Sequence, residues 1–220
     1  MLFLTNSFTR YNQCAVIFSE VFRMIFGLTG AIGSGKSAVL SAFAKHNWIT
    51  VDADKLCHSV YENATDDFIA GLKNIFGAEC VDNNRIVNRK FIAQTVFNNK
   101  EALTKLENLI IPEFEKVFRQ FIDDCKKNNS NAVCEVPLLF EKDYAKFFDA
   151  VIGIWTPDAL RHERLKKFRN MSDEDIAARE KNQFSAEKKI ELADYCIVND
   201  GNTDDIERQI RELLRTVGID

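Results

Sequence analysis

The segment GAIGSGKS, residues 30–37, constrains the fold of this chain more than any other feature. It matches the pattern G-x-x-x-x-G-K-[ST], whose glycines let backbone N–H groups turn toward phosphate oxygens and whose lysine reaches the β- and γ-phosphates. The apolar run IFGLT precedes it and a segment with helical spacing follows, so the pattern stands where a strand passes into a helix. By chance, the pattern arises in roughly one chain of this size in a hundred. The sequence therefore predicts a site for nucleotide phosphates.

Apolar runs alternate with helical patterns along the chain. Five runs are typical of strands buried on both faces of a parallel sheet, and they cover residues 24–29, 48–54, 131–140, 149–155 and 195–199. Helices are expected at about 64–127, where Pro112 should kink or split one of them, in the charged segment 158–192, and at the C-terminus. The pattern predicts an α/β fold with a five-stranded, doubly wound parallel sheet and helical lobes over the ligand site.

Residues 1–23 are interpreted as an extension outside the core, because Met24 stands just before the first convincing strand. Polar residues interrupt the apolar positions of this segment and no small-residue cleavage site follows, which argues against a signal peptide. A weak organelle presequence is the alternative interpretation.

Composition argues against several classes of protein. The formal charge of −4 does not suit a chain whose main partner is nucleic acid. No run approaches the roughly 18 apolar residues of a membrane helix, so no membrane partner is expected. Six scattered cysteines without a C-x-x-C pair suit the reduced thiols of a cytosol better than a disulfide framework or a zinc site. We therefore predict a cytoplasmic protein, as a monomer or weak homo-oligomer.

Two aspartates follow the second predicted strand in the segment VDAD. Asp52 and Asp54 stand at its carboxyl end, which is the edge where ligands bind in open α/β sheets. Phosphoryl transfer needs a carboxylate near the acceptor hydroxyl, but aspartates here can instead cap a helix that begins at residue 55. Both interpretations stay open for Asp52, and the catalytic one is favoured for Asp54. His58 is either an acceptor-site residue or a half-exposed helix histidine.

The type of nucleotide-binding protein follows from what surrounds the glycine-rich segment. A GTPase carries N-K-x-D, whereas the nearest segment here, NNKE at residues 98–101, lacks the aspartate. A motor ATPase needs a strand that ends in Asp-Glu, whereas the third predicted strand offers only Glu135. A small-molecule kinase fits better. A related nucleoside, nucleotide or sugar kinase and a nucleotide-binding regulator without catalysis remain as alternatives.

Taken in order, GLTGAIGSGKS, DAD, LENLIIP, EVPLLFE, the R-x-x-x-R and R-x-x-x-Q region and AD-Y-x-I-x-N-x-G resemble dephospho-CoA kinases. The resemblance runs from about residue 24 to 201. It implies a P-loop NTPase three-layer sandwich in a single kinase domain, 24–220, with a helical acceptor lobe at about 60–128 and a lid at about 158–192. It also implies transfer of the ATP γ-phosphate to the ribose 3′-hydroxyl of dephospho-CoA, with Mg²⁺, as the last step of coenzyme A synthesis.

The resemblance assigns roles to residues of this chain. Catalytic roles fall on Lys36, Asp54 and Arg164. ATP is held by Gly30, Ala31, Ile32, Gly33, Ser34, Gly35, Lys36, Ser37, Asn199 and Gly201, and Ser37 is also the Mg²⁺ ligand. The acceptor is held by Thr29, Asp54, His58, Pro137, Leu138, Leu139, Phe140, Arg179 and Gln183.

Three positions depart from the family pattern. The family's His-Pro pair is Ile111-Pro112 here, a glutamine early in the lid helix is Arg161, and a lid arginine falls on Phe168 with Arg169 one place later. We expect the lid rather than the activity to differ, so that either Arg169 takes over the contact or the lid clamps more weakly. The basic segment ALRHERLKKFR suits a lid that clamps phosphates, or alternatively a solvated helix face.

Overall fold

The computed structural model describes residues 23–97 and 99–219. The predicted extension at residues 1–23 lies outside the described residues except for Arg23. The chain divides into two compact units, each of which is described by itself. The sheet unit reaches to Asp52 and resumes at Asp124, and the helical unit is Ala53–Asp123.

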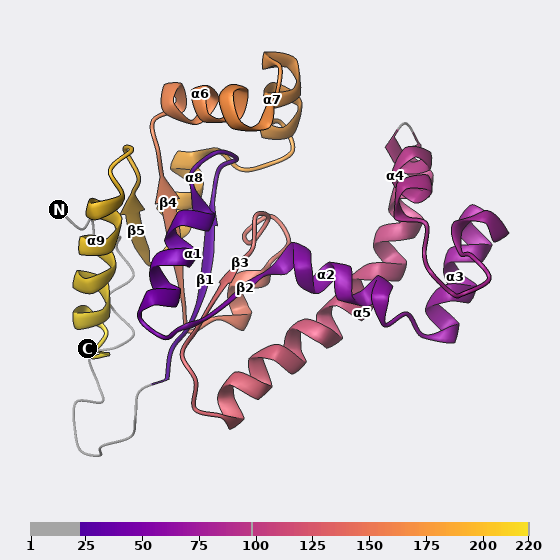
Figure 1. The fold of residues 1–220 in the computed structure, drawn as a ribbon, viewed down its shortest axis with the longest axis horizontal. Helices are drawn as coiled ribbons and strands as arrows, with labels where there is room; N and C mark the ends of the chain where they lie inside the picture. The colour runs from indigo at the N-terminus through magenta and orange to yellow at the C-terminus, as the bar shows by residue number, and fades with distance from the viewer. Residues whose placement is uncertain (1–22, 98, 220) are drawn as a thin grey trace. The chain divides into compact units, whose positions relative to one another are not determined.

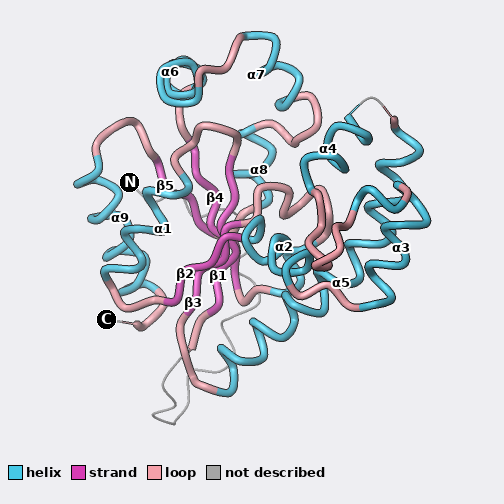
Figure 2. Tube along the Cα trace, turned by 45° about the vertical axis from the view of Figure 1, so that its right-hand side comes forward, coloured by secondary structure: helices cyan, strands magenta, loops and turns pink. Residues whose placement is uncertain are grey.

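The sheet unit contains five parallel strands in the order β2-β3-β1-β4-β5 (Figures 1 and 2). The strands are β1 (Ile25–Gly30), β2 (Ile49–Asp52), β3 (Ala132–Glu135), β4 (Ala150–Trp155) and β5 (Tyr195–Val198). Leu28 of β1 is in register with Glu135 on one side and Ile152 on the other. The predicted α/β fold with a five-stranded parallel sheet is confirmed. Because β1 is the central strand, the glycine-rich segment leaves from the middle of the carboxyl edge.

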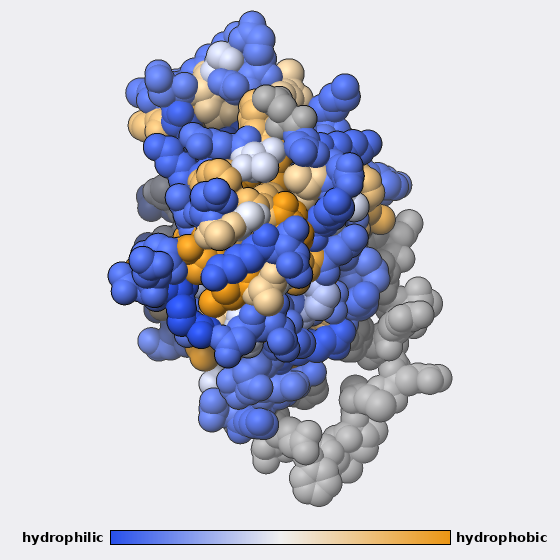
Figure 3. All heavy atoms as spheres, turned by 90° about the vertical axis from the view of Figure 1, so that its right-hand side faces the viewer, coloured by the Kyte–Doolittle hydropathy of each residue, from blue (hydrophilic) through white to orange (hydrophobic). Residues whose placement is uncertain are grey.

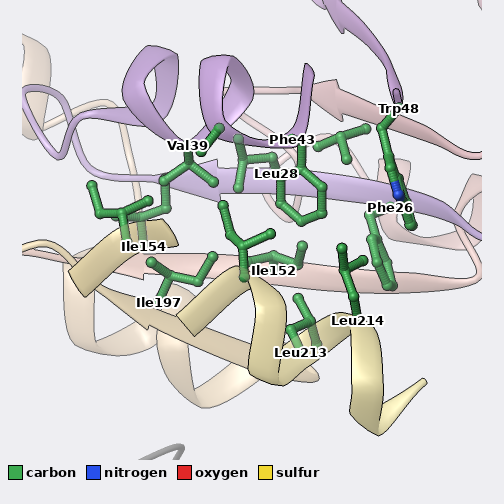
Figure 4. Packing of buried hydrophobic residues seen from close by; sticks show 14 of the residues in the cluster. Phe26, Leu28, Val39, Phe43, Trp48, Ile152, Ile154, Ile197, Leu213 and Leu214 are labelled. Atoms are coloured by element: carbon green, nitrogen blue, oxygen red, sulfur yellow. The ribbon is translucent and has the colours of Figure 1, made fainter. Parts of the chain in front are cut away.

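Helices cover both faces of this sheet, which makes three layers. Phe26 and Leu28 are two residues apart on β1 and therefore point to the same face of the sheet. This face is packed by α1 (Lys36–Lys45) and α9 (Thr203–Thr216), as Figure 4 shows. Phe26 is completely buried and stacks on Trp48 with ring centroids 5.2 Å apart. Burial of one such side chain is worth about 1.5–3 kcal/mol. This core holds the central strand from which the candidate site projects.

The opposite face is covered by α8 (Ala186–Leu192) and by the chain that follows β3. A Cβ atom at Gly153 of β4 would lie 2.7 Å from Ile190 Cδ1 of α8, and one at Gly27 of β1 would lie 2.7 Å from Leu139 Cδ1. These contacts are too close for any side chain, so glycine lets the second layer approach the sheet.

The third strand is shorter than predicted. β3 ends at Glu135, and residues 136–143 form a turn in which Lys142 N donates to Leu138 O and Tyr144 N donates to Leu139 O. Pro137 has no N–H with which to continue a ladder. The apolar run that suggested a strand to residue 140 is therefore a partly buried turn, in which Leu139 is completely buried.

The charged segment 158–192 is helical, as predicted, but consists of three helices. These are α6 (Asp158–Arg169), α7 (Asp173–Glu180) and α8. Asn170 ends α6 in the left-handed conformation with φ 50°, and Ser172 begins α7 with a capping box to Asp175. Ser185 caps α8 by accepting from Lys188 N.

The helical unit is built from α2 (Ala53–Glu62), α3 (Asp66–Phe76), α4 (Arg89–Phe97) and most of α5 (Lys100–Lys127). Pro112 was expected to kink or split a helix; it lies inside the continuous α5, so the split is wrong and the kink stays a prediction. Gly71 of α3 lets Leu109 of α5 pack closely, since a Cβ there would lie 2.7 Å from Leu109 Cδ1. The burial of Leu106, Phe114 and Phe118 along α5 explains why tertiary packing overrides the proline.

The second strand also ends earlier than predicted. β2 stops at Asp52 and α2 begins at Ala53, so Asp54 lies in the first turn of a helix and not at a strand end.

Hydrophilic side chains cover most of the face drawn in Figure 3, and apolar ones gather near its middle. None of the helices in the described ranges is long and apolar enough to cross a membrane.

Candidate active site

The glycine-rich segment wraps into a loop between β1 and α1. Gly33 and Gly35 adopt φ of 80° and 86°, and Gly35 is the N-cap of α1. A Cβ at Gly35 would lie 2.1 Å from Asn199 Nδ2, so both the torsion and the packing require glycine there. The first N–H groups of α1 point toward this loop, which makes the loop a ready anion site.

Lys36 supplies the positive charge of the loop. Its Nζ donates to the carbonyl oxygens of Gly30 at 3.2 Å and Ala31 at 3.4 Å. The carboxylate of Glu135, at the end of β3, lies 4.0 Å from the same nitrogen. The ammonium is thus held within the loop before any nucleotide arrives. Sequence reasoning considered Glu135 only as a possible ATPase carboxylate and missed this contact.

Asn199 supports the loop from β5. Its Nδ2 donates to Ser34 O at 2.8 Å, and Thr156 Oγ1 donates to the same carbonyl at 3.0 Å. Asn199 Oδ1 accepts from Arg164 Nη2 at 3.2 Å. This buried amide therefore joins the loop to an arginine of α6. Both Asn199 and Gly201 lie just after β5. At Gly201 the chain turns, with a φ of 118°, beside Arg164.

The second terminal nitrogen of Arg164 is directed to the loop. Nη1 is buried and has no hydrogen-bond partner among the described residues. It would lie 3.7 Å from a Cβ atom at Gly35. A desolvated guanidinium N–H next to a phosphate loop is a donor that an anionic ligand can satisfy.

Arg161 ties α6 to the loop and to α7. It is 4% exposed, and its Nη1 donates to Ile32 O and to Glu180 Oε1, both at 2.8 Å. Nη2 donates to Asp158 Oδ1 at 2.6 Å. Burial alone would lower the pKa of Arg161, but the hydrogen bonds and charges of Asp158 and Glu180 raise it above its ordinary value. Sequence reasoning recorded Arg161 only as a departure, although the Asp158 spacing of i, i+3 was a readable signal.

The turn after β3 lies beside the loop strand. Thr29 Oγ1, on β1, donates to Pro137 O at 3.3 Å. Leu138 and Phe140 are half-buried, but the Leu139 side chain is completely buried next to Gly27, so it packs in the core.

Two predicted acceptor residues lie at the end of α7. Gln183 lines a cavity of about 200 Å³ together with Ala31, Arg161 and Glu180. Arg179 is exposed on α7. The loop, helices α6 to α8 and this cavity all belong to the sheet unit.

The lid departure at Phe168 is visible in α6. Its ring is 74% exposed, with Lys167 Nζ 5.5 Å from the centroid. Arg169 is also exposed and, within the part of the chain that the structure describes, makes no ion pair. That Arg169 takes over the contact of the arginine missing at Phe168 stays a prediction.

Asp54 and His58 lie one turn apart on α2 in the helical unit, and both are exposed. His58 Nε2 contacts Arg89 Nη2, and the Arg89 guanidinium lies 5.5 Å from the Tyr61 ring centroid. Arg89 makes no ion pair with a carboxylate in the described ranges. Sequence reasoning missed this cation because Arg89 begins a different helix.

Burial, with smaller effects of nearby charges, raises the pKa of two side chains on α2. Burial, together with the charge of Cys57, raises the pKa of Tyr61 to about 12, although Arg89 opposes the shift. Burial and the charge of Asp54 raise the pKa of the Cys57 thiol, again with Arg89 opposing. Both groups are therefore neutral near pH 7.

A metal ion would depend on Ser37 and on the nucleotide itself. Ser37 is exposed in the first turn of α1, and no group of three or more His, Cys, Asp or Glu in the described residues is arranged to hold a metal. One hydroxyl combined with phosphate oxygens and water is a donor set that suits Mg²⁺, which keeps several waters.

Comparison with known proteins identifies the family. A family model for dephospho-CoA kinase matches residues 24–205. The chain belongs to the dephospho-CoA kinase family. A dephospho-CoA kinase from Staphylococcus aureus is 31% identical over 194 residues, which cover 88% of this chain and 93% of that protein. The family resemblance read from the ordered motifs is thereby confirmed.

Solved structures agree with this family and fold. TT1252 from Thermus thermophilus is 30% identical with a TM-score of 0.72, covering 88% of this chain and 97% of its own. The dephospho-CoA kinase from Campylobacter jejuni is 27% identical with a TM-score of 0.68, covering 89% and 98%. Shikimate kinase from Acinetobacter baumannii shares the fold alone, at 14% identity and a TM-score of 0.52 over 90% and 96% of the two chains.

Proposed function

We propose that this protein transfers the γ-phosphate of ATP to the ribose 3′-hydroxyl of dephospho-CoA, giving coenzyme A and ADP. The observation that carries the proposal is the phosphate loop with Lys36 inside it and, beside it, an Arg164 N–H without a partner among the described residues, in a chain of this family. The motor ATPase and GTPase interpretations lack such support.

Lys36 and Arg164 stabilise the charge that develops on the transferred group. Both are held before the ligand binds, Lys36 by the loop carbonyls and Arg164 by Asn199. Preorganised donors of this kind typically contribute a factor of about 10²–10³ each to the rate. The loop N–H groups and the N-terminus of α1 bind the remaining phosphate oxygens.

Asp54 orients the acceptor hydroxyl and accepts its proton. Its carboxylate is exposed in the first turn of α2, and His58 follows one turn later on the same helix. We assign the acceptor to these residues together with Thr29, the turn at residues 137–140, Arg179 and Gln183. Arg89 joins this set because its guanidinium is available to an anionic group.

A bound Mg²⁺ would neutralise part of the charge of the nucleotide phosphates. Ser37 would hold it through its hydroxyl. Asn199 and Gly201 form the turn that we assign to the nucleotide, with Asn199 acting through Ser34 O and Arg164.

We further propose a division of labour between the parts of the chain. The helical unit Ala53–Asp123 serves as the acceptor lobe, and helices α6 to α8 serve as the lid. The protein acts in the cytoplasm as a monomer or weak homo-oligomer and does not bind nucleic acid. Support for a reducing compartment comes from the free thiols of the described cysteines, Cys57, Cys80, Cys125, Cys134 and Cys196.

The test is a coupled assay for ADP with Mg²⁺-ATP and a panel of acceptors. The panel contains dephospho-CoA, adenosine, nucleoside monophosphates, shikimate and gluconate. We expect ADP release that depends on dephospho-CoA and a product one phosphate heavier by mass spectrometry. Transfer to another acceptor would replace this proposal with a related kinase, and ATP binding without any transfer would favour a regulator.

A further inference from the structure

A buried ion pair lies behind the acceptor turn, outside the residues assigned so far. Lys189 of α8 is completely buried, and its Nζ lies 3.0 Å from Glu141 Oε1. The same nitrogen donates to Pro137 O at 2.5 Å. Glu141 is the last residue of the segment PLLFE and is also largely buried. Both charges therefore sit in a poorly solvated place within the sheet unit.

Stability alone does not explain such a pair. Two apolar residues of similar size often give equal or greater stability than a buried ion pair, because desolvation offsets the attraction. Burial lowers the pKa of Lys189, and Glu141 only partly restores it. Glu141 Oε2 is buried without a hydrogen-bond partner among the described residues, which adds a further cost. What an apolar pair lacks is a donor for the Pro137 carbonyl.

The hydrogen bonds of this pair join three segments that the reaction uses. Pro137 O accepts from Lys189 and also from Thr29 Oγ1, one residue before the phosphate loop. Glu141 Oε1 accepts from Lys189 and also from Phe184 N at 2.7 Å. Phe184 lies between α7 and α8, where the lid segment returns to the sheet. One ammonium group thus connects the loop strand, the acceptor turn and the end of the lid.

We propose that Lys189 and Glu141 are positioning residues for the phosphoryl-transfer reaction. Lys189 fixes the backbone of the turn at residues 137–140 relative to the phosphate loop, and Glu141 links that turn to the lid at Phe184. Neither side chain touches the substrate; they act through Pro137 and through the Phe184 N–H. This inference rests on the proposed function, since the turn matters only if it meets the acceptor.

The test compares two neighbouring lysines of α8 in the full-length protein. Lys189→Met removes the buried ammonium and keeps an unbranched side chain that is one atom shorter. Lys188→Met is the matched control, because Lys188 pairs with Glu191 at 2.9 Å on the exposed side of the same helix. Lys189→Arg restores a cation that can donate to both partners. For each protein, kcat, the KM for dephospho-CoA and the Kd for a non-hydrolysable ATP analogue are measured.

We expect Lys189→Met to raise the KM for dephospho-CoA about tenfold while the Kd for the ATP analogue changes less than about twofold. Lys189→Arg should recover most of the loss, and Lys188→Met should match the wild type. If Lys189→Met lowers only the fraction of active protein and leaves KM unchanged, the pair is merely structural and the inference is overturned.

A second variant guards against a protein that fails to fold. Lys189→Met combined with Glu141→Gln removes both charges and keeps an oxygen for the Phe184 N–H. The folded double variant should show the same rise in KM, and an unchanged KM would overturn the inference. A wild type inactive on dephospho-CoA overturns both proposals, whereas an active wild type with an unchanged KM in these variants overturns this one alone.

Discussion

Arg161 of α6 donates a 2.8 Å hydrogen bond from Nη1 to the carbonyl oxygen of Ile32, inside the phosphate loop. The same nitrogen donates to Glu180 of α7, and the second terminal nitrogen donates to Asp158. Helix α6 is thereby fastened to the loop and to α7 at one point. The position that departs from the family pattern is thus a buried junction.

Arg161→Gln should destabilise the protein and weaken ATP binding. The shorter amide cannot reach all three partners, and charge-assisted hydrogen bonds are worth about 1.5–3 kcal/mol each when buried. We expect the free energy of unfolding in urea to fall by about 2 kcal/mol and the KM for ATP to rise several-fold.

Arg208→Gln is the matched control for Arg161. Arg208 also pairs with two carboxylates, Asp205 and Glu212, but on the exposed surface of α9. Exposed pairs contribute little, so this variant should unfold at the same urea concentration as the wild type. Equal effects of the two substitutions would contradict the role given to Arg161.

Gly35→Ala should abolish ATP binding. The φ of 86° disfavours any side chain, and the added methyl group would meet Asn199 Nδ2 at 2.1 Å. Gly218→Ala is the control, because Gly218 has a φ of 74° but nothing within 4 Å of the added atom. Titration with a fluorescent ATP analogue should show no saturation for the first variant and normal binding for the second.

Lys36→Met should reduce kcat about 10²–10³-fold, the usual loss for one preorganised charge in a transition state. The measurement is kcat at saturating ATP and dephospho-CoA, with circular dichroism to show that the variant is folded. Normal turnover by this variant would refute the assignment of the phosphate loop.

Asp54→Asn should reduce kcat about 10²–10⁴-fold, the range for a positioned general base. The Kd for ATP should not change, because the substitution lies in the helical unit and not in the loop. Asp67→Asn, in the first turn of α3, is a control in the same unit and should be fully active. If both variants turn over at the wild-type rate, Asp54 serves only in the first turn of α2 and is not the catalytic base.

Tyr61 should remain protonated well above pH 10, the ordinary pKa of a tyrosine. Its pKa is raised to about 12, first by burial, so absorbance at alkaline pH should lack one tyrosinate that appears near pH 12. Tyr61→Phe should remove that last step. Because the folded pKa exceeds the unfolded value near 10, the contribution of Tyr61 to stability is complete below pH 10 and is lost as the pH rises toward 12.

Local patterns predicted the features that are local. The glycine-rich loop and the five strands follow from residue type and spacing within short segments, and the structure confirms them. The end of β2 was missed because VDAD alternates like a strand while Ala53 already belongs to a helix. The turn after β3 was missed because burial makes a turn as apolar as a strand. In both places tertiary packing, and not the local alternation of apolar residues, decides where the strand ends.

The remaining contacts of the site join residues that are far apart in the sequence. Arg161 meets Ile32 across 129 residues, Lys189 meets Pro137 across 52, and Arg89 meets His58 across 31. No spacing rule connects such positions, so their partners were not predictable from a single sequence. Each was visible only as a charged residue on a helix, for which a solvated surface is the ordinary expectation.

Four carbonyl oxygens of the phosphate loop already accept hydrogen bonds from side chains of the protein itself. Lys36 takes those of Gly30 and Ala31, Arg161 takes that of Ile32, and Asn199 with Thr156 takes that of Ser34. Because these four oxygens are used internally, they are not available to a cation that arrives alone. The eight-residue motif therefore does not carry its structure by itself. An engineer who grafts it onto another scaffold must also graft the distant side chains that donate hydrogen bonds to its carbonyl oxygens.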